Sequence, residues 1–225
     1  VTATPTVTPI TTAGPFTVPH PKGLAAGWQK LFVASNTTGN LFVFNTTTGE
    51  KVAEVPTGKE PWSVKALNGK VYVGNFAEGT ISVINPVTLK KIKDIKPHDY
   101  GCPGAPANMA TTGALGTDTV FVAMYGNPGR VAVIDAETDE FTECIETNGS
   151  GVFSVAVDER FGYLYVTSRD AMSLQVFDYR SMPIKPLQII DLNGVPYSMI
   201  ADKGRVYVAV AYDVPKYENA GTIIV

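Results

Sequence analysis

The sequence predicts an all-β protein, a β-propeller built from four-stranded antiparallel blades. The first observation is a recurring pair of apolar segments, in which an aromatic–valine pair precedes a second apolar run. The second is the repeat length of roughly 40 to 50 residues, which is typical of propeller blades. The aromatic–valine pairs are Phe32-Val33, Tyr72-Val73, Phe121-Val122, Tyr165-Val166 and Tyr207-Val208.

The second apolar segment of each repeat ends in an Asn or Asp. The complete copies are Val43-Phe44-Asn45, Val83-Ile84-Asn85, Val133-Ile134-Asp135 and Val176-Phe177-Asp178, and a fifth copy reaches Ile223-Ile224-Val225. Asn and Asp side chains accept hydrogen bonds from backbone N–H groups two residues further on. We therefore expect these four Asx residues to close turns rather than to bind a ligand.

The second repeat predicts its four strands in order. From the propeller axis outward they are 62–67, 70–75, 80–85 and 91–95. Asn68-Gly69 lies between the first two and predicts a two-residue hairpin turn. In the fifth repeat the run Val206–Val210 is continuously apolar, which is typical of a strand that is buried on both faces.

The ends of the repeat array suggest how the ring closes. Outermost strands are expected near 51–55, 91–95, 140–145 and 187–190, and the fifth repeat has none. Phe16-Thr17-Val18 stands where an outermost strand would belong, and pairing it with 222–225 would cover the free sheet edge. The expectation is therefore five blades closed by an N-terminal strand; the alternative is a fragment of a propeller with six to eight blades.

Composition separates an N-terminal arm from the propeller and excludes some partners. Residues 1–14 are rich in Thr and Pro and uncharged, which favours an extended linker or arm, and 15–225 form the propeller. The net charge of −3 gives no reason to expect nucleic-acid binding. No apolar run approaches the roughly 18 residues of a transmembrane segment.

Cysteines and sequons together favour an extracytoplasmic protein. Cys102 follows the last strand of the second repeat and Cys144 lies in the last strand of the third, so neighbouring blades could pair them; two free buried thiols are the alternative. Three sequons in predicted turns offer glycosylation at Asn36, Asn45 and Asn148. We therefore expect a secreted or cell-surface protein.

The motif residues resemble the YVTN family of β-propeller repeats. The matching runs include Val71-Tyr72-Val73-Gly74-Asn75, Ile81-Ser82-Val83-Ile84-Asn85 and Thr57-Gly58-Lys59-Glu60-Pro61. The fourth repeat departs with Arg169-Asp170, and the fifth carries the insertion 212–220. The resemblance implies the fold and a range of functions, from surface-layer proteins to lactonase-like enzymes, but transfers no catalytic residue.

Few residues suggest catalysis or metal binding. The only histidines are His20 and His98, in different repeats, so no haem pocket or zinc site is expected, and neither a metal nor a cofactor is predicted. A calcium-dependent, lactonase-like site would draw on Glu60, Asn108 and Asp202. These three do not occupy equivalent positions in their repeats, which weakens that alternative.

The residues that open the innermost strands form the strongest candidate binding site. Trp62, Phe153 and Tyr197 occupy equivalent positions, with Lys22 and Ala107 in the other two repeats. Near the mouth of a propeller such residues could hold a sugar, a peptide or an apolar segment. The alternative is that they only plug the channel and pack on neighbours. The loops 97–107 and 212–219 are further candidate contact surfaces.

These observations predict a non-enzymatic binding or structural module of a cell-surface or extracellular assembly. Its expected partner is a protein or a glycan, with self-assembly or membership of a larger complex as alternatives. The competing interpretation is a lactonase-like or quinoprotein-type enzyme, which rests on fold analogy.

Overall fold

The computed structural model describes residues 16–113, 118–180, 183–211 and 221–224, so the predicted arm 1–14 and the insertion 212–220 lie outside the described residues. It is all-β, with four four-stranded antiparallel sheets and one three-stranded sheet. The strands of the first two sheets are β1 (Pro21–Gly27), β2 (Lys30–Ser35), β3 (Asn40–Asn45), β4 (Lys51–Pro56), β5 (Pro61–Leu67), β6 (Lys70–Asn75), β7 (Thr80–Asn85) and β8 (Lys90–Ile95).

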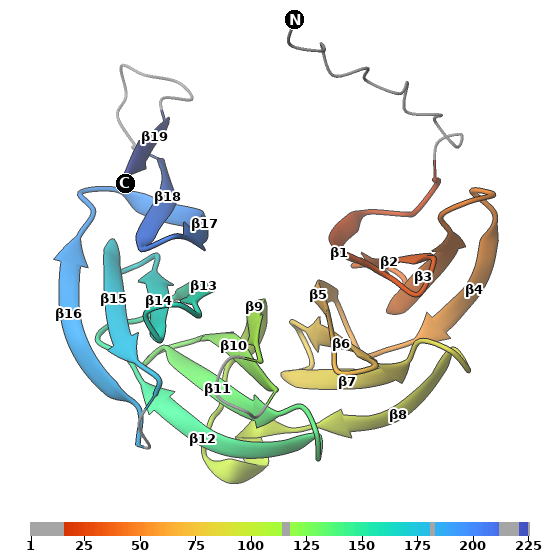
Figure 1. The fold of residues 1–225 in the computed structure, drawn as a ribbon, viewed down its shortest axis with the longest axis horizontal. Coiled ribbons are helices and arrows are strands. Elements are labelled where there is room, and N and C mark those ends of the chain that lie inside the picture. The colour runs from red at the N-terminus through yellow and green to blue at the C-terminus, as the bar shows by residue number, and fades with distance from the viewer. Residues whose placement is uncertain (1–15, 114–117, 181–182, 212–220, 225) are drawn as a thin grey trace, which may run out of the picture.

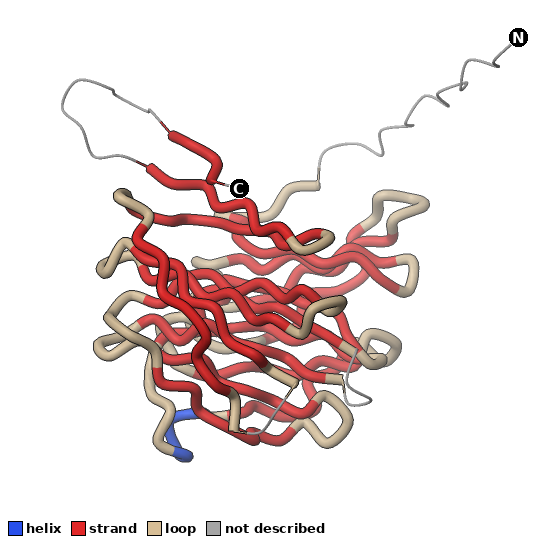
Figure 2. The backbone as a smooth tube through the Cα atoms, turned by 60° about the vertical axis from the view of Figure 1, so that its left-hand side comes forward, coloured by secondary structure: helices blue, strands red, loops and turns tan. Residues whose placement is uncertain are grey.

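The remaining sheets follow a short 3-10 helix, η1 (Pro97–Tyr100). Their strands are β9 (Ala105–Thr112), β10 (Thr119–Tyr125), β11 (Arg130–Asp135), β12 (Glu140–Glu146), β13 (Val152–Asp158), β14 (Tyr163–Ser168), β15 (Ser173–Asp178), β16 (Lys185–Asp191), β17 (Val195–Asp202), β18 (Arg205–Ala211) and β19 (Gly221–Ile224). Figure 2 shows short turns joining nearly all of them. Within every sheet, strands that are consecutive in the chain pair with one another.

The five sheets stand side by side around a common centre, as the repeats predicted. Figure 1 shows β1, β5, β9, β13 and β17 on the inner side of an arc, with β4, β8, β12 and β16 outside. The predicted strands of the second repeat agree with β5 to β8 to within one residue at each end. The all-β propeller prediction is confirmed.

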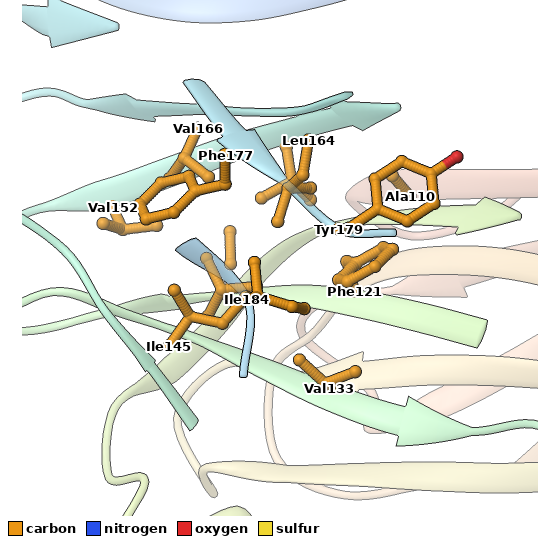
Figure 3. Close-up of a cluster of buried hydrophobic side chains, with 13 residues drawn as sticks. Ala110, Phe121, Val133, Ile145, Val152, Leu164, Val166, Phe177, Tyr179 and Ile184 are labelled. Atoms are coloured by element: carbon orange, nitrogen blue, oxygen red, sulfur yellow. The ribbon is translucent and has the colours of Figure 1, made fainter. Parts of the chain in front are cut away.

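The hydrophobic core lies between successive sheets rather than at one centre. Figure 3 shows the cluster between the third and fourth sheets, where Phe121 and Val133 meet Leu164, Phe177 and their neighbours. Similar clusters join the first sheet to the second, the second to the third, and the fourth to the fifth. Each sheet is therefore stabilised mainly by the sheets on either side of it.

The turn residues behave as their sequence pattern predicted. The Oδ1 atoms of Asn45, Asn85 and Asp135 each accept hydrogen bonds from backbone N–H groups two and three residues later. Asp178 accepts the backbone N–H of Arg180 in the same way. Asn68 and Gly69 have φ values of 47° and 70°, as a hairpin turn with two left-handed residues requires.

The expected closing strand is not formed. Residues 16–18 lie outside any strand, and the fifth sheet consists of β17, β18 and β19. The ring of Phe16 lies 4.7 Å from that of Phe44, and Val18 packs on the same apolar cluster of the first sheet. This segment covers the face of the first sheet that is turned away from the second sheet, and it does not pair with β19. Figure 1 accordingly shows the first and fifth sheets at the two ends of an open arc.

The fifth sheet also differs from the prediction in its burial. The run Val206–Val210 was expected to be buried on both faces, but Val208 and Val210 are buried while Ala209 is exposed. The buried residues pack against the fourth sheet. The fifth sheet stands at one end of the arc, so among the described residues only one of its faces meets another sheet.

Cys102 and Cys144 form a disulfide, with their Cα atoms 5.6 Å apart. The alternative of two free thiols is therefore wrong. The bond joins the segment after η1 to β12, and it lies against the core between the second and third sheets. Among the residues that the structure places, no helix has the length and apolar character needed to cross a membrane.

Candidate ligand-binding site at the axial mouth

A cavity of about 390 Å³ opens where the innermost strands begin. All five sheets contribute to its wall, which includes Lys22, Trp62, Lys65, Asn108, Phe153 and Tyr197. Its size is within the range of small-molecule sites in proteins. The structure thus brings Lys22, Trp62, Phe153 and Tyr197 together around one cavity, while their role in binding stays a prediction.

A β-bulge in every innermost strand positions these side chains. Next to the start of each strand two residues face one residue of the neighbouring strand. Trp62, Phe153 and Tyr197 are the extra residues of β5, β13 and β17, and Lys22 lies in the corresponding irregular stretch of β1. A bulge bends the strand and redirects the side chain, which explains why residues of five sheets converge here.

Aromatic rings form a closed group at this mouth. The centroid of Trp62 lies 5.3 Å from Phe76 and 6.4 Å from Phe153, and Tyr125 lies 6.0 Å from Phe76 and 6.5 Å from Phe153. Phe76 and Tyr125 were not predicted. The pairing between strands could have placed both residues at this mouth. Tyr125 pairs with the first residue of β9, and the residue before Phe76 pairs with the first residue of β5.

Two cations lie on these rings. Lys22 Nζ lies 4.4 Å from the ring centroid of Trp62. The guanidinium carbon of Arg169 lies 4.9 Å from the centroid of Phe153 and 4.5 Å from that of Tyr197. Arg169 bridges the fourth and fifth sheets and was noticed in the sequence only as a departure from the repeat. Such cation–π contacts hold the charged groups in place at the rim.

Polar groups line the deeper wall. Asn108 Nδ2 donates to Ser154 Oγ at 3.2 Å, and Asn108 Oδ1 accepts the backbone N–H of Met109 at 2.7 Å. These contacts fix the amide across the third and fourth sheets. Ser63 is 6% exposed, and its Oγ has no hydrogen-bond partner among the described residues. Burial lowers the pKa of the Lys65 ammonium, which also faces this cavity.

Ala107 and the calcium candidates occupy different environments. Ala107 is 1% exposed and leaves room at the mouth where the other sheets place large side chains. Asn108 lines the axial cavity, but Glu60 lines a separate cavity and Asp202 ends β17, four residues beyond Ser198 at the mouth. The structure therefore does not bring Glu60, Asn108 and Asp202 together as a metal site.

The histidines do not converge either. His98 lies in η1, where its Nε2 is 3.2 Å from Asp99 Oδ1, and His20 directly precedes β1. Among the residues with described positions, no three His, Cys, Asp or Glu side chains are grouped so that they could hold a metal ion.

The three sequon asparagines differ in accessibility. Asn148 is exposed at the end of β12, although its backbone N–H and C=O both bond the side chain of Gln175. Asn45 is half-buried, with its Oδ1 engaged in the turn. The Nδ2 atom of Asn36, to which a glycan would attach, is covered in the folded chain. Asn148 is thus the most accessible of the three.

Comparisons with known proteins identify the fold. No protein-family model matches the sequence, and no curated protein matches it. Among solved structures, hydrazine synthase of Kuenenia stuttgartiensis is similar, with a TM-score of 0.68 and 17% identity over 96% of this chain and 64% of that one. The computationally designed Ika8 protein is also similar, with a TM-score of 0.67 and 14% identity over 84% of this chain and 55% of that one.

This chain spans less than two thirds of the length of either structure. At such low identity the likeness shows the β-propeller fold alone. Function must therefore be argued from the site.

Proposed function

We propose that this chain is a non-enzymatic, extracytoplasmic binding module that holds its ligand in the axial cavity. The observation that carries this proposal is the convergence of Trp62, Phe153 and Tyr197 with Lys22 at the mouth of one cavity. If these side chains only plugged the channel, they would fill it and leave no axial cavity between them. Tyr197 is 45% exposed, and Trp62 and Phe153 are half-buried, so all three rings keep surface available for contact.

The chemistry of the cavity suits an amphipathic ligand. Aromatic rings provide large apolar contact surfaces at little entropic cost, and they favour sugar rings and apolar side chains. Asn108 and Ser198 add polar atoms at the same wall. A glycan or a segment of a protein partner is therefore the proposed ligand class.

Two features of the chain support the proposed extracytoplasmic setting. The disulfide between Cys102 and Cys144 is of a kind that persists in oxidising compartments, and Asn148 offers an exposed sequon. The resemblance of the repeats to the YVTN family agrees with a surface-layer or cell-surface role. The proposed partner is thus part of an extracellular or cell-surface assembly.

The test is a screen of the whole chain against a glycan array and a peptide array. Retention of a ligand by the wild-type chain and at least about tenfold weaker binding by Trp62→Ala would support the proposal, because truncating an aromatic contact removes much of its contact energy. Trp28→Ala is the matched control, since Trp28 follows the opposite end of β1 and does not line the cavity. Equal loss in both variants would contradict the proposal.

Self-assembly is tested separately by sedimentation velocity over a hundredfold range of protein concentration. If a second copy is the partner, the sedimentation coefficient rises with concentration and Trp62→Ala removes the rise. A constant coefficient would leave glycan or another protein as the partner class.

A further inference from the structure

The axial cavity carries positive charge in a protein of net charge −3. Lys22 and Lys65 line it, and Arg169 lies on two of its aromatic rings. Among the described residues, no Asp or Glu lines the cavity, and none of these three cations forms an ion pair. Elsewhere Lys51, Lys70, Lys91 and Arg180 each have a carboxylate partner. The cations at the mouth are thus left available to an outside anion.

Lys65 makes this arrangement more specific. It lies three residues further along β5 than Trp62 and is half-buried, and its ammonium has no hydrogen bond to a described residue. A partly buried ammonium without a partner pays for its desolvation, and an anion bound beside it would offset that cost. The lowered pKa of Lys65 has the same cause. The exposed Lys22 and the half-buried Lys65 therefore offer two cationic contacts in the wall of the same cavity.

We infer that the ligand of this cavity is an acidic saccharide, whose sugar ring lies against the aromatic side chains and whose carboxylate contacts Lys65 and Lys22. This inference rests on the proposed binding function. Trp62, Phe153 and Tyr197 supply apolar surface for the C–H face of a sugar ring. Lysine ammonium groups supply charge-assisted hydrogen bonds to a carboxylate.

The shape of the site favours a saccharide over an acidic peptide. An extended peptide usually binds along a sheet edge or a groove, where backbone pairing supplies affinity. Here the wall is made by short stretches of five strands that meet around one cavity of about 390 Å³. Because no single strand supplies a long edge to this wall, we expect a ring-shaped body to fit it better than an extended chain.

The experiment uses the whole chain and isothermal titration calorimetry with matched probes. Trigalacturonate is the acidic probe, and its fully methyl-esterified form has the same rings without charge. Trigalacturonate is expected to bind at least about tenfold more tightly than the ester, because a hydrogen bond to a charged group is worth more than one between neutral groups. The preference should decrease as the salt concentration rises.

Variants locate the charge that is responsible. Lys65→Met and Lys22→Gln should each reduce the preference for the acid over the ester by about fivefold or more, because each removes a cation that contacts the carboxylate. Lys93→Gln is the matched control, because Lys93 is exposed on the outermost strand β8. Circular dichroism spectra that match the wild type show that each variant is folded.

Three results would overturn the inference. If the ester binds as tightly as the acid, the cavity is a neutral-sugar site and the binding function survives. If hexaglutamate binds more tightly than trigalacturonate and depends on Lys65, the ligand is an acidic peptide. If neither galacturonate probe binds, the acidic-saccharide inference is wrong; the binding function fails with it only if the array screen also retains nothing.

Discussion

The phenol of Tyr72 in the second sheet donates a hydrogen bond of 2.7 Å to Asp139 Oδ1, in the turn between β11 and β12 of the third sheet. Tyr72 is fully buried and Asp139 is 6% exposed, and the other carboxylate oxygen lies 2.8 Å from Lys70 Nζ. The network joins two blades through polar contacts, in addition to the apolar cluster between the second and third sheets to which Tyr72 also belongs. A buried carboxylate needs each of these partners, so losing one should be costly.

Tyr72→Phe removes the phenol and leaves Asp139 with one partner fewer. We expect the free energy of unfolding to fall by about 1–3 kcal/mol, which is the cost of leaving a buried acceptor unsatisfied. Urea denaturation followed by fluorescence measures the change. Tyr100→Phe is the control, because Tyr100 is 63% exposed and its phenol has no hydrogen bond to a described residue. A loss for Tyr72→Phe no larger than that for Tyr100→Phe would show that the network contributes little.

The same phenol makes stability depend on alkaline pH. Burial, together with the hydrogen bond to Asp139, raises the pKa of Tyr72 far above its usual 10.0. Above pH 10 the unfolded chain loses this proton and the folded chain keeps it, so stability should fall as pH rises, by up to about 1.4 kcal/mol per pH unit. Below pH 10 the group should contribute no pH dependence.

Comparison with Tyr72→Phe isolates this contribution. Tyr165 and Tyr179 also have raised pKa values because of burial, and they remain in both proteins. The difference in unfolding free energy between wild type and variant should therefore shrink between pH 10 and 11.5. A constant difference over that interval would mean that Tyr72 ionises equally in the folded and unfolded chains.

The disulfide should contribute substantially to stability. It closes a loop with a sequence separation of 42 residues, for which the chain-entropy model gives about 4 kcal/mol. The double variant Cys102→Ala, Cys144→Ala should unfold at a correspondingly lower urea concentration. Reducing agent should destabilise the wild type and leave the double variant unchanged. If the wild type is equally insensitive to reductant under conditions shown to break the bond, the predicted contribution is wrong.

Gly23 marks the closest approach of the first and second sheets at the mouth. A Cβ atom at this position would lie 2.7 Å from backbone atoms of Trp62, Ser63 and Val64. Gly23→Ala should therefore push β1 away from β5 and cost about 1–3 kcal/mol, as overpacking does. It should also separate Lys22 from Trp62, which would appear as a shift of tryptophan emission.

Gly27→Ala provides the control within the same strand. Nothing lies within 4 Å of a Cβ atom at Gly27, so this change should leave stability and emission almost unaffected. Equal effects of the two substitutions would contradict the tight contact between β1 and β5.

Local patterns predicted most of the fold but less of the site. Tyr72-Val73 and Asn85 located strands and turns because alternation and turn chemistry depend on neighbouring residues only. The convergence of Trp62, Phe153 and Tyr197 also followed from repeat alignment. Phe76 and Arg169 were missed because their approach to the cavity depends on the register between strands, which the repeat pattern does not specify.

The behaviour of Phe16 could not be predicted for a related reason. An apolar segment beside a sheet can either pair with a free edge or pack on an uncovered face. The sequence shows that Phe16 and Val18 are apolar, but it does not indicate whether they contact the free edge or the uncovered face. In the structure Phe16 and Val18 pack on the face of the first sheet, against the ring of Phe44 and its neighbours.

The bulges at the start of the innermost strands have a consequence for how such a protein can change. A residue that stands outside the ladder of backbone pairs can be exchanged without shifting the alignment of any strand. Trp62, Phe153 and Tyr197 occupy such places. New binding specificities could therefore arise by substitution at these few unpaired positions, while the blades continue to assemble as before.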